Sequence, residues 1–420
     1  MFNSNTYMDQ VENVKSVRDD ASAMFDRQVS FVQRALDKTK GDRWIWIIIL
    51  LLSMISIMVV YSATGAIAYK KGVSVEKYLL FKHVIFVLLG IGMIYIAHLL
   101  DYKYYAGISK ILMIVTVPLL LYTLAFGQTL NDASRWVKIP VIGLTFQTSD
   151  LAKLALITFL ARMLTRKQEN IKDVKQAFLP IMGSVCVVFV LIALANLSTA
   201  LMLFGVSILL LIIGRISIKQ IATVCAGGLV LLMLVVFLGP RRETYKSRIN
   251  SFLHPELQHS DKTYQSDHSK IALATGGFLG KGPGNSTERN FLPHPYSDFI
   301  FAIIIEEYGT VGGLAVMVLY LVLLYRCVRI VNRSPKAFGA LLAAGLSFSL
   351  TIQAFANMAV AVGLGPVTGV PLPLVSMGGT SMIFTSIAFG IILSVSRDVE
   401  ENSSVKKEDK VVVGEIPAMA

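Results

Sequence analysis

Charged residues and cysteines are both scarce in this sequence. Only 16% of its 420 residues are Asp, Glu, Lys or Arg, and only three are cysteine. So little charge is not enough to cover the surface of a soluble protein of this size. The three cysteines, Cys186, Cys225 and Cys327, have no paired spacing, which argues against a disulfide framework and against a cysteine-ligated metal site.

Two further features are absent. The sequence contains no motif typical of nucleic-acid binding, and much of its formal net charge of +12 lies in short loops, so we expect no nucleic-acid partner. The first apolar run follows 43 polar residues and has no small-residue cleavage site behind it. We therefore expect the first helix, and not a cleaved signal peptide, to direct the chain to the membrane.

What the sequence does contain is a series of long apolar runs. Hydrophobic residues make up 54% of the chain, and its mean hydropathy is +0.63. Crossing a bilayer takes roughly 20 apolar residues in a helix, because lipid offers no partners for unpaired backbone groups. Nine long runs and a shorter one near 150–164 fit this description; the nine lie near 44–63, 80–99, 109–127, 177–195, 197–213, 218–239, 299–325, 337–361 and 374–396.

The distribution of basic residues decides between nine and ten spanning helices. The shorter run carries Lys153 and ends at Arg162, so its composition alone leaves its status open. If all ten runs span and the N-terminus is cytoplasmic, the inner loops are rich in Lys and Arg, whereas the short outer loops contain only Lys70, Lys71, Lys77, Arg135 and Lys138. The positive-inside rule predicts this asymmetry.

We therefore predict an all-α polytopic membrane protein with about ten transmembrane helices and both termini in the cytoplasm. Residues 1–43 form an N-terminal extension, residues 44–396 the membrane domain, and residues 397–420 a charged C-terminal tail. Apolar residues at near-helical spacing in the extension indicate either an amphipathic docking helix or a partly ordered tail. One long extracytoplasmic loop, residues 240–298, separates helices seven and eight.

This long loop is basic and rich in glycine. It carries eight Lys and Arg residues, among them Arg248 and Lys281, and residues 275–286 include five glycines. Backbone amides in such a run can approach a ligand closely, so one interpretation is an anion site for a phosphate or pyrophosphate. Long loops also tolerate basic residues on the outer face without a functional reason. The run lacks the GxxxxGK[ST] spacing of a nucleotide-binding P-loop.

Three carboxylates near the start of the eighth run are candidates for chemistry. Asp298 is expected to be the N-cap of the helix, where an anion gains about 0.3–1 kcal/mol; this suits a general base, although capping alone also explains the residue. Glu306 and Glu307 lie inside the apolar run, where ionisable side chains are usually functional or paired. Glu306 lies about 12 Å along the helix from Asp298, too far for the carboxylate pair of a glycosidase.

Two other polar stretches stand out. Arg135 lies in the outer loop after the third run, and Lys153 lies inside the fourth, where snorkelling to the surface is the alternative to a functional role. Residues 369–381 open the last run with prolines and small hydroxyl residues, including Ser376 and Ser381, which either line a site or permit close helix packing. Neither stretch identifies a substrate by itself.

Together these stretches resemble the SEDS family (shape, elongation, division and sporulation), which includes FtsW, RodA and SpoVE. The resemblance covers about residues 44–396. It rests on motifs in a fixed order: Arg135-Trp136, Phe146-Gln147, Leu151-Ala152-Lys153, residues 248–255, 276–286, 291–293 and 297–301, Glu306-Glu307-Tyr308-Gly309, Asn357, and Pro371-Leu372-Pro373 leading to Ser376, Gly378, Gly379 and Ser381. The sequence departs from the family pattern at Thr148, Asp150, residues 196–198 and residues 296–297, so we leave Asp150 and Asn196 out of the predicted catalytic set.

The resemblance implies a peptidoglycan glycosyltransferase that polymerises lipid II at the outer face of the cytoplasmic membrane. Asp298 falls on the family's essential aspartate, which we interpret as the general base for an attacking sugar hydroxyl. We expect Arg135, Lys153 and Arg248 to contact the pyrophosphate or the lipid carrier. The full set of predicted substrate-binding residues is Arg135, Lys153, Arg248, Lys281, Glu306, Glu307, Asn357, Ser376 and Ser381.

The resemblance also implies partners and a cofactor. A class B penicillin-binding protein would cross-link the product, other division or elongation proteins would join the complex, and a divalent cation, Mg or Mn, would assist without dedicated metal ligands. The charged extensions favour a role in division, at the septum. Two alternatives stay open: a lipid II flippase, with Lys153, Glu306 and Glu307 along its path, and a scaffold that recruits the division machinery through its tails.

Overall fold

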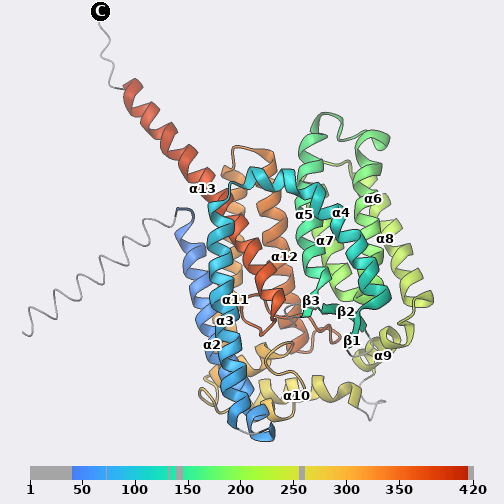
Figure 1. The fold of residues 1–420 in the computed structure, drawn as a ribbon, viewed down its shortest axis with the longest axis vertical. Coiled ribbons are helices and arrows are strands. Elements are labelled where there is room, and N and C mark those ends of the chain that lie inside the picture. Colours follow the sequence, from blue (N-terminus) through green and yellow to red (C-terminus); the bar gives the residue numbers. More distant parts are fainter. Residues whose placement is uncertain (1–39, 72, 131–132, 139–144, 255–260, 415–420) are drawn as a thin grey trace, which may run out of the picture.

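The computed structural model describes residues 40–71, 73–130, 133–138, 145–254 and 261–414. The predicted N-terminal extension therefore lies outside the described residues except at its end. Ten helices occupy the positions of the ten apolar runs (Figure 1): α2 (Arg43–Lys71), α3 (Val73–Leu99), α4 (Tyr102–Phe126), α5 (Thr148–Arg166), α6 (Leu179–Ala195), α7 (Leu197–Ile213), α8 (Ile218–Leu238), α11 (Ile300–Arg333), α12 (Ala337–Ala361) and α13 (Thr380–Gly414).

The predicted all-α polytopic membrane fold is confirmed. Among the described residues, eight spans are long and apolar enough to cross a membrane, and α6 reaches this length together with the π-helix Val174–Phe178 that precedes it. The other two are α7, which is apolar but has only 17 residues, and α5, which carries Asp150, Lys153 and Arg162. Both are packed within the bundle, where neighbouring helices surround their polar groups.

Polar residues at the turns set several helix boundaries. Asp101 caps α4 by accepting a hydrogen bond from the backbone N–H of Lys103, and Ser217 caps α8 by accepting one from Gln220. Asn196 does the same for α7 through the N–H of Thr199. These caps satisfy N–H groups that have no partner inside the helix. Asn196, one of the departures from the family pattern, therefore has a local structural role.

Shorter elements gather at one end of the bundle, which we call the loop end (Figure 1). They are α9 (Arg242–Leu253), α10 (Asp261–Gly276), the 3-10 helix η4 (Glu288–Asn290), and the strands β1 (Gln128–Leu130), β2 (Ala133–Lys138) and β3 (Thr145–Gln147). The strands form an antiparallel sheet in the order β1-β2-β3. Neither the sheet nor the two loop helices was predicted. The 3-10 helix η1 (Gln168–Asn170) and the π-helix η2 (Val174–Phe178) lie between α5 and α6.

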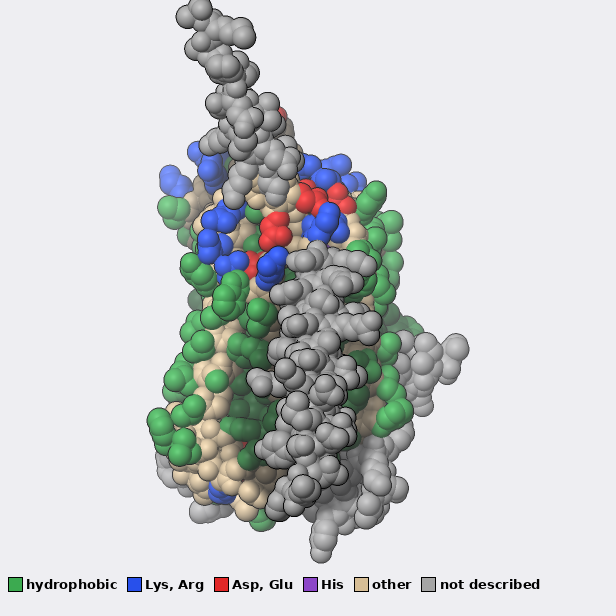
Figure 2. All heavy atoms as spheres, turned by 90° about the vertical axis from the view of Figure 1, so that its left-hand side faces the viewer, with side chains coloured by type: hydrophobic (Ala, Val, Ile, Leu, Met, Phe, Trp, Pro, Cys, Tyr) green, Lys and Arg blue, Asp and Glu red, His purple; other side chains and the backbone are tan. Residues whose placement is uncertain are grey.

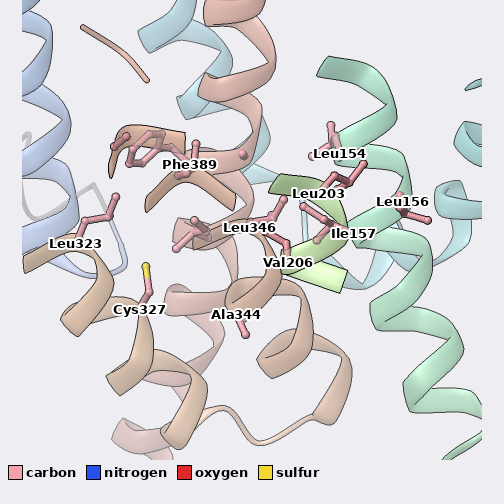
Figure 3. Packing of buried hydrophobic residues seen from close by; sticks show 14 of the residues in the cluster. Leu154, Leu156, Ile157, Leu203, Val206, Leu323, Cys327, Ala344, Leu346 and Phe389 are labelled. Carbon is pink, nitrogen blue, oxygen red and sulfur yellow. The ribbon is translucent and has the colours of Figure 1, made fainter. Parts of the chain in front are cut away.

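The buried core lies where α5, α7, α11, α12 and α13 meet. Figure 3 shows its side chains interleaving between these helices: Leu154 and Ile157 from α5, Leu203 and Val206 from α7, Leu323 and Cys327 from α11, Ala344 and Leu346 from α12, and Phe389 from α13. Because lipid is as apolar as these side chains, close van der Waals packing between them, and not removal from water, holds the helices together. In contrast, α8 lies at the edge of the bundle with most of its apolar side chains exposed.

The opposite end of the bundle, where α13 continues outward, is the tail end. Here Asp42 joins three helices: its carboxylate lies 2.8 Å from Nε of Arg326 in α11, and its backbone N–H donates to Oγ of Ser396 in α13 over 2.8 Å. Along its length α13 packs against α3. Figure 2 shows Lys, Arg, Asp and Glu side chains in a band at this end, with hydrophobic side chains below it.

The boundary of the last apolar run differs from its prediction. Helix α13 begins at Thr380, not near residue 374. The preceding segment contains Pro371 and Pro373, and Leu374 has a φ of 61°. Proline lacks the N–H that a helix interior needs, and a positive φ is incompatible with a right-handed helix. Residues 362–379, which we call the C-terminal segment, therefore form an irregular connection at the loop end.

Candidate active site

A cavity of 550 Å³ opens at the loop end of the bundle. Four parts of the chain line it: Trp136, Thr145 and Gln147 of the sheet; Arg248 and Gln265 of α9 and α10; residues 293–299; and Val367, Gly369, Pro371, Met377, Gly378 and Ser381. We call this the Asp298 cavity. It brings together three of the predicted site residues, Asp298, Arg248 and Ser381.

The C-terminal segment and α12 fix the backbone at Asp298. The side-chain amide of Asn357 donates to the carbonyl oxygen of Asp298 and to that of Val370, both over 2.8 Å. The hydroxyl of Ser376 donates to the carbonyl of Ser297 over 2.6 Å. Both side chains are buried. A carbonyl group that is removed from water and has no hydrogen-bond donor costs free energy. These bonds therefore fix the backbone position of Asp298, from which its side chain extends.

Asp298 is not the N-cap that the sequence predicted. Helix α11 begins at Ile300, its N-cap is Phe299, and no side chain caps it. Instead, Oδ1 of Asp298 accepts a hydrogen bond of 2.9 Å from the hydroxyl of Ser297. The hydrogen bonds from Asn357 and Ser376, which we call the tether, hold residues 297 and 298 against the C-terminal segment. The helix therefore begins only after these two residues. Asp298 is one of the residues that line the cavity.

Arg248 supplies positive charge to the same cavity. Its guanidinium donates to the carbonyl of Val367 over 2.9 Å, which joins α9 to the C-terminal segment. Burial lowers the pKa of Arg248, and the nearby Arg241 lowers it further, whereas Asp298 opposes this shift. Burial, and then the charge of Asp298, raises the pKa of Tyr296. The Tyr296 hydroxyl therefore stays protonated and able to donate.

The small sheet positions two further lining residues. Trp136 of β2 pairs with Gln147 of β3, so both side chains lie on the same face of the sheet. The hydroxyl of Thr380, at the start of α13, donates to the carbonyl of Thr145 over 2.9 Å and holds the sheet against the bundle. Arg135 belongs to β2, but its side chain lies outside the described residues.

Lys153 lies one layer behind the cavity wall. It forms an ion pair with Asp150 at 2.8 Å and donates to the side-chain oxygen of Gln353 over 2.8 Å. Gln353 in turn donates to the carbonyl of Pro371, which lines the cavity. In this structure Lys153 supports the wall and does not itself line the cavity. A direct contact with substrate, as expected from the sequence, would require it to move.

Glu306, Glu307 and Lys281 form a cluster separate from the lining of the Asp298 cavity, and their role in substrate binding stays a prediction. Glu306 accepts hydrogen bonds from Nζ of Lys281 over 2.6 Å, from the N–H of Thr287 over 3.0 Å, and from the hydroxyl of Ser286. Both glutamates are fully buried and absent from the cavity lining. The expectation that intramembrane carboxylates are functional or paired is met here by pairing.

Glu307 ties this cluster to α2. Its carboxylate accepts hydrogen bonds from the hydroxyl of Ser62 and, over 3.3 Å, from the N–H of Ser286. Arg289 donates to both the carbonyl and the hydroxyl of Ser62 over 3.0 Å. The cluster therefore connects α2, η4 and the first turns of α11. Its observed contacts hold the loop to the bundle.

The glycine run packs against a kink in α11, which gives part of the run a structural role. At Gly309 the helix has φ 69° and ψ −174°. The N–H groups of Lys281 and Gly282 donate to the carbonyls of Glu306 and Glu307 over 2.9 Å. These amides are used by the helix and not offered to a ligand. A Cβ on Gly280 would lie 2.2 Å from the carbonyl of Glu307, so only glycine fits this close approach.

Several lining residues were missed by sequence reasoning. They include Gln265, His294, Tyr296, Val367 and Met377. Gln265 and Val367 lie far from Asp298 in sequence and have no chemical signature of their own. His294, between two prolines, had a detectable signal, because a histidine in a rigid turn beside a candidate base is a typical site residue.

The chain is an integral membrane protein of the FtsW/RodA/SpoVE family of cell cycle proteins, whose model matches residues 42–401. Stage V sporulation protein E of Bacillus subtilis is 35% identical over 370 residues, covering 86% of this chain and 98% of that protein. The probable peptidoglycan glycosyltransferase FtsW of Geobacter sulfurreducens is 34% identical over 349 residues, covering 82% and 92%. The predicted family membership is thereby confirmed.

Solved structures share the fold. A chain of a peptidoglycan synthase complex that coordinates polymerization and crosslinking superposes with a TM-score of 0.67 at 23% identity, over 85% of this chain and 98% of that one. The rod shape determining protein RodA of Thermus thermophilus gives 0.61 at 22% identity, over 85% and 97%.

Proposed function

We propose that this protein is a peptidoglycan glycosyltransferase that polymerises lipid II into glycan strands. One observation carries the proposal: a single carboxylate, Asp298, is fixed by backbone hydrogen bonds in a cavity that also contains the Arg248 guanidinium. A base beside a cation is the arrangement that glycosyl transfer from a pyrophosphate requires. The names of the relatives supply the substrate class.

In the proposed reaction, the 4-hydroxyl oxygen of one sugar forms a bond with the anomeric carbon of another. The bond between that carbon and the pyrophosphate oxygen breaks, and its electron pair leaves with undecaprenyl pyrophosphate. The hydroxyl proton passes to the Asp298 carboxylate, and the anomeric configuration inverts. Because pyrophosphate is a good leaving group, one base and nearby cations suffice.

The other lining residues fit supporting roles in this reaction. Arg248 stabilises the negative charge that grows on the pyrophosphate, and Ser381 and Tyr296 offer hydroxyl groups to the substrate. Asn357 and Ser376 act on the reaction by positioning Asp298. Arg135 remains a proposed pyrophosphate contact because it is adjacent to the lining residue Trp136.

A divalent cation fits this cavity only if the substrate shares in binding it. Among the described residues, no group of three or more His, Cys, Asp or Glu side chains lies together. Asp298 is a single carboxylate, and Mg²⁺ commonly binds one or two carboxylates together with substrate phosphates. Such an ion, Mg²⁺ or Mn²⁺, would supply charge neutralisation at the leaving pyrophosphate and would be held mainly by the substrate phosphates and water, which leaves Asp298 as the base.

The band of basic residues at the tail end supports the orientation of the chain. Basic residues favour the cytoplasmic side, so the tail end and both termini are proposed to be cytoplasmic. The loop end and the Asp298 cavity then face outward. Residues 40–42 already lie at the tail end, paired with α11 and α13. The relatives named FtsW favour a role in cell division at the septum.

A surface on α11 supports the proposed partner, a single-pass class B penicillin-binding protein. Exposed apolar side chains recur at the spacing of a helix-packing seam: Val311, Leu314, Val318, Leu321, Tyr325 and Val328. A single transmembrane helix of a partner would cover this stripe. Cysteines introduced at Leu314 and Leu321 should cross-link to that partner helix, whereas a cysteine at Leu229 on α8 should not.

The flippase alternative receives little support from the geometry. It required Lys153, Glu306 and Glu307 along one path, but the two glutamates are enclosed by the loop and Lys153 is paired within the bundle. The small cavity beside Lys153 measures only 30 Å³. A scaffold role does not explain why Asn357 and Ser376 hold the backbone at Asp298 beside a cavity.

The decisive experiment uses the purified protein, its class B partner and labelled lipid II. We expect glycan polymer from the wild-type protein and none from Asp298→Asn that is folded and bound to the partner. Polymerisation that survives this substitution would refute the assignment of Asp298 as the base. A cell that grows normally with Asp298→Asn would favour the scaffold.

A further inference from the structure

A second cavity adjoins the Asp298 cavity and has no part in the proposed chemical step. It measures 460 Å³, within the range of roughly 300–1,000 Å³ that is typical of small-molecule sites. Arg248, Gln265 and Val367 belong to the walls of both cavities. The two therefore meet at the hydrogen bond between Arg248 and the Val367 carbonyl. We call the second one the α9 cavity.

One face of α9 forms most of the wall. The α9 side chains that line the cavity form two neighbouring rows, each with a spacing of four residues, as expected for a single helical face: Glu243, Ser247 and Ser251 in one row, and Thr244, Arg248 and Phe252 in the other. Gly365 and Pro366 add to the wall. Asn250 lies on the same helix, is exposed, and lines neither cavity. It therefore provides a matched position for a control substitution.

The two cavities differ in chemistry. The Asp298 cavity contains a carboxylate, a guanidinium and the imidazole of His294. The α9 cavity shares Arg248, but the rest of its interior presents neutral hydroxyl and amide groups, from Thr244, Ser247, Ser251, Gln265 and Ser266. Its only other ionisable side chain among the described residues, that of Glu243, is 76% exposed and lies beside Arg242.

Neutral hydroxyl and amide groups match the hydroxyl and N-acetyl groups of an amino sugar, because each can donate and accept. Phe252 adds an apolar ring against which the C–H face of a pyranose can pack. Such a lining offers little to a second pyrophosphate, which would call for several cations. The lining therefore fits uncharged saccharide.

We propose that the α9 cavity is a saccharide subsite that holds the units of the glycan strand beyond the sugar that reacts at Asp298. This inference rests on the proposed glycosyltransferase function. No bond forms or breaks in the α9 cavity. Its effect is to retain the strand between successive additions, so that the same strand is extended again before it dissociates.

Filling the cavity tests the proposal through strand length. With labelled lipid II, Ser247→Phe should shorten the glycan strands several-fold while the first coupling of two lipid II molecules keeps its wild-type rate. Asn250→Phe adds the same side chain outside the cavity and should give wild-type strands. Equal strand lengths in the two variants would overturn the proposal. If Ser247→Phe melts at a lower temperature than Asn250→Phe, Thr244→Phe fills the same cavity and replaces it.

A binding measurement separates this inference from the proposed function. Lipid-free oligosaccharides of alternating N-acetylglucosamine and N-acetylmuramic acid, with each lactyl carboxyl amidated so that the sugars are uncharged, should bind the full-length Asp298→Asn protein saturably. Ser247→Phe should weaken that binding by about tenfold or more, which corresponds to about 1.4 kcal/mol. Binding that Ser247→Phe does not change overturns the subsite. If the oligosaccharides bind but the wild-type protein forms no polymer, the proposed glycosyltransferase function is refuted, whereas the α9 cavity is still supported as a saccharide-binding site.

Discussion

Two acidic regions lie within one stretch of this chain, yet the structure gives them opposite surroundings. Asp298 faces an open cavity of 550 Å³, and its backbone is held by Asn357 from another helix. Glu306, only eight residues later, is completely buried and surrounded by donors from residues 281–288. The comparison shows that a carboxylate inside an apolar run can serve the architecture, whereas the one at the edge of the run lines the cavity in which we propose the chemistry.

Replacing Asp298 should give the largest effect and should separate activity from stability. Loss of a general base typically lowers a rate by about 10²–10⁴-fold, so Asp298→Asn should abolish measurable polymer. The melting temperature in detergent should stay near that of the wild type, because the tether acts on the backbone and not on the carboxylate. A large fall in melting temperature would show that Asp298 resembles Glu306 after all.

Replacing Glu306 should give the reverse pattern. Removing one member of a buried ion pair costs about 3–5 kcal/mol in other proteins, and the partly exposed Lys281 places this pair toward the lower end. Glu306→Ala should therefore lower the melting temperature strongly, with activity lost only in proportion to the folded fraction. Full stability with lost polymerisation would return Glu306 to the list of substrate contacts.

Asn357 sharpens the comparison because its side chain is structural, like that of Glu306, but the backbone that it holds is that of the proposed base, Asp298. Asn357→Ala leaves the half-buried carbonyl of Asp298 and the buried carbonyl of Val370 without this donor, at about 1–3 kcal/mol for the buried one and less for the other. We expect a fall in kcat of about tenfold to a hundredfold with little change in KM, since the substrate contacts remain. A rise in KM alone would indicate that Asn357 contacts the substrate directly.

The smallest effect is expected at Ser376. It donates one hydrogen bond to Ser297 and accepts one from the N–H of Leu372, and a single bond contributes about 0.5–1.5 kcal/mol. Ser376→Ala should reduce polymerisation by less than about tenfold, and Ser376→Thr should restore part of it. If Ser376→Ala matched Asn357→Ala in effect, the C-terminal segment would be the main tether of Asp298.

The membrane helices were predictable because lipid imposes a length and an apolar composition on each one. The runs at 197–213 and 337–361 coincide with α7 and α12. The small sheet could not be predicted, because strands of three residues gain their stability from pairing partners and not from their own composition. The kink at Gly309 was not predicted for a similar reason, because it depends on the glycine run that packs against it.

At the site, the sequence allowed us to select residues near the cavity, but it did not show what each side chain contacts. Asp298, Arg248 and Ser381 were predicted and do share a cavity. Asn357 and Ser376 were assigned to the substrate, yet the structure shows them bonded to the backbone around Asp298. Glu306 and Lys281 were also assigned to the substrate; the structure shows them paired with each other, and a contact with substrate stays a prediction. Contacts of this kind depend on tertiary packing that periodicity does not encode.

The junction at Asp42 has a consequence for how the chain is made. Asp42 precedes the first membrane helix, but its partners Arg326 and Ser396 are translated much later, and α3 packs against the last helix, α13. A ribosome adds about 5–20 residues per second, so α2 and α3 wait in the bilayer for many seconds before their final neighbours arrive. Chains that stop short of α13 should remain open on that side, which makes the unfinished protein a natural substrate for membrane quality-control proteases.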